Sequence, residues 1–421
     1  MTGNETGYYE PSPLPPSHNG EVNEIPPPTP DHILIIGCGI AGLATAICLK
    51  RAGIEATIFE SHPTTRDSSG AFFGLHPNGR DVLKTLGVAD TALAEGIATR
   101  EFHFSNNKRS LTTVATDVIT IRRGAVARAL REEVISQGTS IRYGKQLTAI
   151  TQTNDRVMAT FEDGTHANGA CLIGSDGIHS KTRRIIFGDS PRPYYTGMVR
   201  SATVIKNTLG LKPSYGTTNM IIGREAFFSY LVRPDDLIYW FSNRFDKAAP
   251  SQGEIEAISQ ADWQAELMSL YDGDNPIIGR IIAATDDTIQ KYPVYDMPLI
   301  ADWHKQRVCL IGDAAHAPSP KAGQGASMAL EDAITIAKCL RDIPDIRQAF
   351  ATFESLRKQR VETLFKKTRE SAGNKTPRTA VGRFVADLLL PINLKIAGRT
   401  TRSMYDYHID WNEPVKTATG R

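Results

Sequence analysis

The feature that most limits how this chain can fold is a glycine-rich turn between an apolar strand and a helix. Residues 33–36 (Ile-Leu-Ile-Ile) form a continuously apolar run, as expected for a parallel strand covered on both faces. The turn Gly-Cys-Gly-Ile-Ala-Gly (37–42) follows, and apolar residues at helical spacing predict a helix over 40–51. A second strand, 56–59, ends at Glu60. This order predicts a βαβ unit.

Each glycine of the turn has a separate physical role. Gly37 allows the tight turn, Gly39 lets the backbone approach a pyrophosphate, and Gly42 lets helix and strand pack closely. Glu60, 18 residues past Gly42, is placed to accept hydrogen bonds from a ribose diol, and its charge disfavours an NADP 2′-phosphate. The pattern predicts dinucleotide binding and leaves NAD and FAD open, with a simple packing turn as the alternative.

A second strand-to-turn segment begins at Cys171. The strand runs into Gly-Ser-Asp176-Gly177, and Ser180 and Arg183 stand one helical turn apart downstream. By physical chemistry alone, Asp176 could cap the following helix or contact a ligand, and both interpretations stay open.

A third segment crowds glycine and proline between a strand and a helix. The apolar run 308–311 ends at Gly312-Asp313, where α/β sheets place groups that contact ligands. A carboxylate there suits a polyhydroxylated chain. Gly323-Gln324-Gly325 then opens a helix whose free N–H groups can stabilise negative charge. Something flat and partly anionic is expected to lie against this backbone.

Taken together, the three segments resemble the FAD-dependent aromatic hydroxylases, which are single-component flavin monooxygenases of the para-hydroxybenzoate hydroxylase fold and include salicylate hydroxylase-like enzymes. The resemblance covers residues 33–375. It implies an α/β fold in which a Rossmann-like FAD-binding domain is interlaced with a smaller mixed-sheet substrate domain, plus C-terminal helices. It also implies FAD as cofactor, NADPH or NADH as co-substrate, and O2.

The resemblance assigns roles to particular residues. His316, Pro320, Gly323, Gln324 and Gly325 match a His-x3-Pro-x2-Gly-Gln-Gly pattern beside the flavin ring. The implied FAD-binding residues are Gly37, Gly39, Gly42, Glu60, Arg123 (with Arg122 as the alternative register), Asp176, Asp313, Pro320, Gly323, Gly325 and Ala326. Two positions depart from the family: Ser327 replaces a common Asn, and Lys321 stands where an apolar residue or His is usual. Lys321 either favours an anionic ring or substrate, or points to solvent.

The implied reaction has three steps. NAD(P)H reduces FAD, dioxygen forms a C4a-hydroperoxide, and one oxygen atom passes to an electron-rich carbon of an aromatic or cyclic enol substrate. Hydroxylation is expected, in secondary-metabolite biosynthesis; epoxidation, Baeyer–Villiger oxidation and a non-catalytic dinucleotide sensor are the alternatives. The candidate catalytic residues are Arg200, Tyr230 and Arg224, joined by Tyr239 and His76, with Phe72, Phe73, Phe228 and Trp240 lining an aromatic pocket or the core.

Composition and apolar patterning along the chain predict its division into domains. The predicted parts are a disordered proline-rich tail (1–30), a first FAD-binding part (31–190, with 70–100 on the substrate side), an antiparallel substrate domain (191–293), a second FAD-binding part (294–375) and a C-terminal helical segment (376–421). The apolar stretch 384–398 is interrupted by Pro391 and Lys395, and a packed helix pair is favoured over membrane contact.

Composition excludes several classes of function. A net charge of +2 argues against nucleic acid as the main partner, since no strong field steers a polyanion. The start has no signal-peptide pattern and no apolar stretch is long enough to span a bilayer. The five cysteines stand singly, without metal-ligand spacing, which indicates core thiols in a reducing compartment. We expect a cytoplasmic monomer or homodimer without a metal.

Overall fold

The computed structural model describes most of the chain, namely residues 32–65, 67, 72–107, 109–246, 248–318, 323–372, 389–390 and 404–416. The predicted tail 1–30 lies outside the described residues, and so do Pro320 and Lys321. Of the apolar stretch 384–398, only residues 389 and 390 are described.

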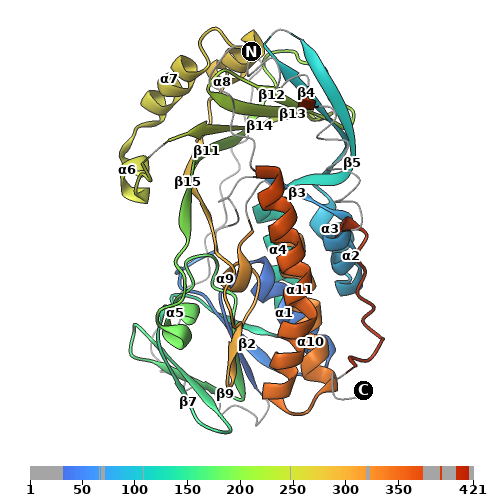
Figure 1. Cartoon of the computed structure of the whole chain (residues 1–421), viewed down its shortest axis with the longest axis vertical. Helices are drawn as coiled ribbons and strands as arrows, with labels where there is room; N and C mark the ends of the chain where they lie inside the picture. Colours follow the sequence, from blue (N-terminus) through green and yellow to red (C-terminus); the bar gives the residue numbers. More distant parts are fainter. Residues whose placement is uncertain are drawn as a thin grey trace, which may run out of the picture.

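A six-stranded sheet forms the centre of the lower half of the molecule (Figure 1). Its strands, in spatial order, are β16 (His304–Lys305), β17 (Val308–Leu310), β10 (Cys171–Gly174), β1 (Ile33–Ile36), β2 (Ala56–Phe59) and β6 (Ser140–Arg142). All neighbours are parallel except β16 and β17. The five parallel strands therefore have the order 3-2-1-4-5, which is that of a Rossmann sheet with its switch point between β1 and β10.

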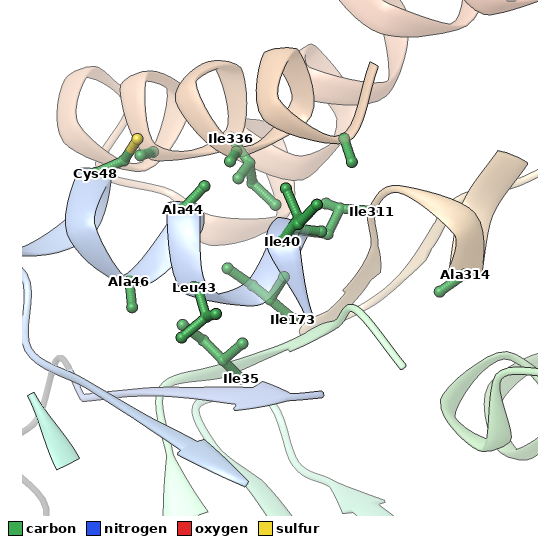
Figure 2. Packing of buried hydrophobic residues seen from close by; sticks show 14 of the residues in the cluster. Ile35, Ile40, Leu43, Ala44, Ala46, Cys48, Ile173, Ile311, Ala314 and Ile336 are labelled. Atoms are coloured by element: carbon green, nitrogen blue, oxygen red, sulfur yellow. The ribbon is translucent and has the colours of Figure 1, made fainter. Parts of the chain in front are cut away.

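Helices cover this sheet. They are α1 (Ile40–Arg51), α2 (Pro77–Leu86), α3 (Ala89–Leu93), α4 (Arg123–Ser136), α5 (Lys181–Phe187), α9 (Asp313–His316), α10 (Gly325–Asp342) and α11 (Ile346–Ala372). Helix α1 is apolar on all sides because it lies between the sheet and α10. Figure 2 shows Leu43 directed to Ile35 of β1, while Ala44 faces Ile336 of α10. A three-stranded antiparallel sheet lies at the lower edge: β7 (Leu147–Gln152), β8 (Val157–Phe161) and β9 (His166–Gly169).

A second, eight-stranded mixed sheet forms the upper half (Figure 1). Its strands, in spatial order, are β15 (Gln290–Asp296), β11 (Tyr194–Lys206), β14 (Leu237–Phe245), β13 (Ala226–Val232), β12 (Thr217–Ile222), β4 (Ile97–Asn106), β5 (Ser110–Arg122) and β3 (Phe72–Leu75). Only β12 and β4 pair in parallel. The predicted α/β fold with an interlaced mixed sheet is confirmed, and the sheet takes strands from two distant parts of the chain.

The two faces of the mixed sheet differ. One face packs against helices α6 (Gln252–Ala257), α7 (Gln260–Leu270) and α8 (Pro276–Ala283), and we call it the helix-covered face. Phe228 and Trp240 are fully buried core residues on this face and do not line a pocket. On the opposite face, Phe72 at the β3 edge touches Tyr239 and Phe241 of β14. The sheet must curl to bring β3 and β14 together, so this second face is concave and aromatic.

Of the predicted C-terminal helical segment 376–421, the structure describes only residues 389–390 and 404–416. After a short helical stretch at Met404 and Tyr405, residues 406–416 follow an irregular path. The reason is that α10 side chains satisfy backbone carbonyls of this segment: Lys338 donates to the carbonyl of Asp410 and Arg341 to that of Trp411. In the part of the chain that the structure describes, no helix combines the length and apolar character needed to cross a bilayer.

Close packing at Gly42 gives a testable prediction. A Cβ at Gly42 would lie 2.1 Å from the carbonyl oxygen of Gly37, which is backbone and cannot move aside. Gly42→Ala is therefore expected to lower the free energy of unfolding by about 2 kcal/mol or more, despite the better helix propensity of Ala. Gly253→Ala in α6, where a Cβ meets nothing within 4 Å, is the control and should be neutral or slightly stabilising. Equal stability of both variants in urea melts would contradict the packing argument.

Candidate active site

The glycine-rich turn and the Asp176 segment meet at the switch point. Gly37 has φ of 105°, and a Cβ there would lie 2.6 Å from the carbonyl oxygen of Ser175. The Ser175 hydroxyl donates to the carbonyls of Ile36 at 2.8 Å and Gly37 at 3.1 Å. Two motifs that are 138 residues apart in the sequence are therefore in contact at the carboxyl ends of β1 and β10, where a Rossmann sheet has its ligand-binding crevice.

The first turn of α1 has the properties of an anion site. Its N-cap is Gly39, which supplies no side-chain hydrogen bond, so the first backbone N–H groups of the helix stay uncapped by a side chain. A Cβ at Gly39 would meet nothing within 4 Å, which leaves open space in front of these groups. Both features fit a pyrophosphate.

Glu60 is held at the end of β2 by backbone donors. One carboxylate oxygen accepts from the N–H of Cys38 at 2.9 Å, and the other accepts from the N–H of His62 at 2.9 Å. Burial alone would raise the pKa of Glu60, but these two hydrogen bonds, together with those from the side chains of His62 and Ser61, outweigh it and lower the pKa. Glu60 is thus an oriented carboxylate beside the glycine turn, as a ribose-binding acid should be.

Asp176 helps to cap helix α5, whose N-cap residue is Ser180. Its carboxylate accepts from the N–H and hydroxyl of Thr182, at 2.9 and 3.0 Å, and from the hydroxyl of Ser180 at 2.5 Å. The capping interpretation of Asp176 is therefore confirmed, while its contact with a cofactor stays a prediction. Arg183 is also structural: its buried guanidinium donates to the carbonyls of Ile178 and Ala314, both at 2.7 Å, and so ties this loop to α9.

The Gly312-Asp313 turn faces the start of α10. Gly312 has φ of 56°, and its N–H donates to Asp332 at 2.8 Å. Asp313 opens α9, and its carboxylate oxygen lies 3.8 Å from the position of a Cβ at Gly325. Helix α10 begins at Gly325, has no side-chain cap, and places the half-buried Ala326 in its first turn. The carboxylate of Asp313 thus lies close to the uncapped start of α10.

Two adjacent carboxylates in the middle of α10 hold this turn from behind. Asp332 is fully buried and accepts from Nε2 of His316 at 2.6 Å and from Nε of Arg357 at 2.7 Å. Burial opposes the charge of Asp332, but His316 and Arg357 lower its pKa to about 2. Glu331, equally buried, pairs with Arg357 and Arg360, both at 2.6 Å. We call Glu331, Asp332, Arg357 and Arg360 the buried charge cluster.

The cluster reaches the Gly-Gln-Gly turn through α2. Asn78 donates to Glu331 at 2.6 Å and to the side-chain carbonyl of Gln324 at 2.9 Å. The sequence reasoning missed Asn78 and all four cluster residues, although a Glu-Asp pair inside an otherwise apolar helix was a readable signal. The buried Arg357 and the half-buried Arg360 make this cluster a structural ion network, since every oxygen of the two carboxylates faces a donor.

Several buried polar atoms beside this turn have no protein partner. They are the side-chain amide nitrogen of Gln324, the amide oxygen of Asn78 and the hydroxyl of Ser327. Buried polar groups are normally satisfied, so unpaired ones at the mouth of α10 fit a site built for a bound group. The departure from the family at position 327 has a structural reason. A Cβ at Gly79 would lie 2.6 Å from the Ser327 hydroxyl, so α2 and α10 pack closely here and need a small side chain at position 327.

His76 lies at the edge of the same site. Its Nε2 is 3.1 Å from the position of a Cβ at Gly323, and its ring stacks on Tyr405 with centroids 4.2 Å apart. Burial, aided by Arg80, lowers the pKa of His76 to about 4. His76 therefore presents a neutral imidazole to the Gly-Gln-Gly turn.

Arg123 and Arg122 are distinguished by their partners. Arg122 pairs with Glu95, whereas Arg123 is exposed at the first position of α4. The arrangement favours Arg123 for the predicted cofactor role.

The three candidate catalytic residues do not lie together. Arg200 on β11 is on the concave face, where its Nε donates to Asn243 at 2.9 Å and its guanidinium lies 5.2 Å from the Phe241 ring. Tyr230 pairs with Trp240 across β13 and β14, which puts its side chain on the helix-covered face. Arg224 is tied to the buried Asp274 at 3.3 Å, next to α7. Arg200 alone of the three faces the aromatic concavity, with Phe72 and Tyr239; Phe73 packs into the core of the lower domain.

Within the described ranges, no group of three or more His, Cys, Asp or Glu side chains is arranged to hold a metal ion. All five cysteines are free, and four of them are buried. Cys38 is half-buried in the glycine turn, and its pKa is raised to about 12, mainly by burial.

The burial of neutral His76 gives a pH-dependent prediction. The unfolded chain takes up a proton near pH 6.5, but the folded chain does so only near pH 4, so stability falls as the pH drops through this window. Between pH 7 and pH 5, His76→Phe should lose about 2 kcal/mol less stability than the wild type. Chemical denaturation at both pH values measures this. His166→Phe, at an exposed site, is the control; parallel losses in the wild type and His76→Phe would refute the burial of a neutral imidazole.

Comparison with known proteins supports the same site. The family described as "FAD binding domain" matches residues 31–368. The FAD-dependent urate hydroxylase of Klebsiella pneumoniae is 30% identical over 350 residues, covering 80% of this chain and 88% of that protein. A 3-amino-4-hydroxybenzoate 2-monooxygenase of Streptomyces platensis is 30% identical over 366 residues, covering 80% and 87%.

A solved structure shows the same fold. The Klebsiella pneumoniae protein HpxO, in complex with FAD and uric acid, superposes with a TM-score of 0.75 at 24% identity, covering 89% of this chain and 96% of that one. The family match spans most of the chain and includes the glycine turn, Glu60 and the Gly312 to Gly325 region. This chain therefore belongs to the FAD-dependent aromatic hydroxylases, and it is a flavoprotein monooxygenase whose cofactor is FAD.

Proposed function

We propose that this enzyme uses NAD(P)H and O2 to hydroxylate a planar, electron-rich aromatic or cyclic enol substrate that carries a negative charge or an acidic hydroxyl. The observation that carries the proposal is Arg200. It is a half-buried guanidinium, oriented by Asn243, on a concave face that also carries the aromatic rings of Phe72, Phe227 and Phe241. A cation fixed among aromatic rings matches a flat anionic ring better than an aliphatic or cationic molecule.

Arg200 has two separate effects on such a substrate. Its charge lowers the pKa of a bound phenol or enol, and the resulting anion is the electron-rich form that accepts an electrophilic oxygen atom. Its planar donors also fix the orientation of the ring. Phe72, Phe241 and Phe227 supply ring surfaces on the same concave face and exclude water from it.

The FAD-binding residues follow from the crevice. The glycine turn and α1 would hold the pyrophosphate, and Glu60 would accept hydrogen bonds from the adenosine ribose. Asp313 would accept from the ribitol chain, and the N–H groups after Gly325 would face the polar edge of the ring. When bound, FAD supplies the redox chemistry, taking a hydride from the nicotinamide and activating dioxygen. The uncapped end of α10 stabilises negative charge at the ring edge.

The names of the relatives support this class of substrate. Urate and 3-amino-4-hydroxybenzoate, which two relatives are named for, are both electron-rich rings with acidic groups. The assignment of NADPH or NADH, the cytoplasmic location, the part in secondary metabolism and the monomeric or homodimeric state stay predictions.

The test is an assay of the purified, FAD-loaded protein against hydroxybenzoates, hydroxypyridines, purines, indoles and cyclic enol polyketides. NADPH and NADH oxidation and O2 uptake are followed together, and products are identified by mass and NMR. We expect one class to couple NAD(P)H oxidation to insertion of one oxygen atom as a hydroxyl group. A lactone or an epoxide as product would replace hydroxylation with the corresponding outcome. A colourless protein that oxidises no NAD(P)H would overturn the enzymatic proposal in favour of a dinucleotide sensor.

The role of Arg200 in substrate binding can be tested against that of Tyr230. Arg200→Gln should raise KM for the accepted substrate roughly 10- to 100-fold, the loss expected for hydrogen bonds to a charged group, with unchanged FAD content. Tyr230→Phe, on the helix-covered face, should change KM less than about twofold by the same scale. The exposed Arg280→Gln on α8 is the matched control. A KM that responds to Tyr230 and not to Arg200 would place the substrate on the wrong face of the sheet for this proposal.

A further inference from the structure

The C-terminal segment Met404–Lys416 lies beyond the part of the chain that the FAD-binding family covers, which ends at residue 368. It nevertheless runs along α2 and α10 of the FAD-binding half (Figure 1). Most of its side chains are exposed, but Met404 and Trp411 are buried against the main core. We call residues 404–416 the C-terminal strap.

The far end of the strap is anchored on α1 and α10, away from the crevice. The Trp411 ring lies between the guanidinium groups of Arg51, at 5.4 Å, and Arg341, at 4.7 Å. Arg341 also donates to the carbonyl of Trp411 at 2.7 Å, and the N–H of Val415 donates to Asp342 at 2.8 Å. These contacts fix the path of the strap without touching any predicted FAD-binding residue.

The near end of the strap reaches the Gly-Gln-Gly turn through His76. The Tyr405 and His76 rings are stacked with 15° between their planes, and His76 Nε2 points at Gly323. The imidazole is 8% exposed, so Tyr405 covers one side of it while the turn covers its Nε2 edge. Without Tyr405, the His76 ring would lose the contact that selects its orientation.

A second contact chain joins the strap to the same turn. Arg360 donates to the carbonyl of Met404 at 2.7 Å and lies 3.9 Å from the Tyr407 ring. The same guanidinium pairs with Glu331, which holds Asn78, which in turn donates to Gln324. Gly323 is thus linked to the strap through His76. Gln324 is linked to it through Asn78, Glu331 and Arg360.

We propose that the C-terminal strap is part of the FAD site and that Tyr405 is a positioning residue, which fixes His76 against the turn where the polar edge of the flavin binds. Tyr405 itself does not touch the cofactor in this arrangement. Its effect is to hold the imidazole in one orientation, so that binding FAD does not have to order it. The strap therefore completes the site from outside the segment that defines the family.

The experiment measures FAD binding to the full-length protein by quenching of flavin fluorescence, with the visible flavin spectrum as a second readout. Neither depends on a substrate, so the outcome is independent of the proposed reaction. Tyr405→Ala should weaken FAD binding by about three- to tenfold, the range expected when one aromatic pair is lost, and shift the flavin spectrum. Tyr405→Phe keeps the stack and should bind as the wild type does. Tyr215→Ala, at an 83% exposed site on the mixed-sheet half, is the matched control.

A double-mutant cycle separates positioning from general destabilisation. If Tyr405 acts through His76, Tyr405→Ala should weaken FAD binding in the wild type but have no further effect in a His76→Ala background. Tyr405→Leu, which keeps more buried volume, replaces Tyr405→Ala in the cycle should the alanine variant not fold. Unchanged FAD affinity in Tyr405→Ala and Tyr405→Leu, or equal losses in the wild-type and His76→Ala backgrounds, would overturn the proposal.

Discussion

Two carboxylates buried side by side in α10 are the constraint on which much of this structure depends. Glu331 and Asp332 are both inaccessible to solvent, and an uncompensated buried charge costs several kcal/mol. Arg357 and Arg360 compensate them from α11, so α10 and α11 have one permitted register. Asp332 also accepts a hydrogen bond from the N–H of Gly312. Glu331 accepts from Asn78, which in turn contacts the turn before α10. The ion network thereby also positions the two turns at which we propose that FAD binds.

The mixed sheet supplies the other half of the site because it curls. Phe72 on the edge strand β3 contacts Tyr239 on β14, near the other edge, so one face of the sheet is concave. Residues of the sheet therefore lie either on this concave face or on the helix-covered face. Side chains alternate along each strand, so a difference of one position decides whether a residue meets the helices or the concavity. Arg200 and Phe241 fall on the concave side, whereas Trp240 and Tyr230 fall on the other.

The FAD-binding half could be predicted from the sequence because its motifs depend on local residue requirements. The turn 37–42, Glu60 and the Gly312 turn each need particular residue types at fixed spacing, because close backbone approach, positive φ and an oriented carboxylate are local requirements. The capping role of Asp176 was weighed correctly for the same reason. Buried partners such as Asn78 carried no local signal, since their importance lies in neighbours that are more than 200 residues away.

The sequence by itself therefore determined the βαβ unit, the Rossmann-like half and the flavin family, since these depend on short motifs whose physical demands are local. Tertiary structure alone decided which candidate faces the substrate, because that depends on strand register and on the curl of a sheet assembled from distant segments. It also decided that the C-terminal strap meets His76, as stacking between residues 76 and 405 requires the whole fold to bring them together. Pairings over such separations are set by packing, which no single stretch of sequence specifies.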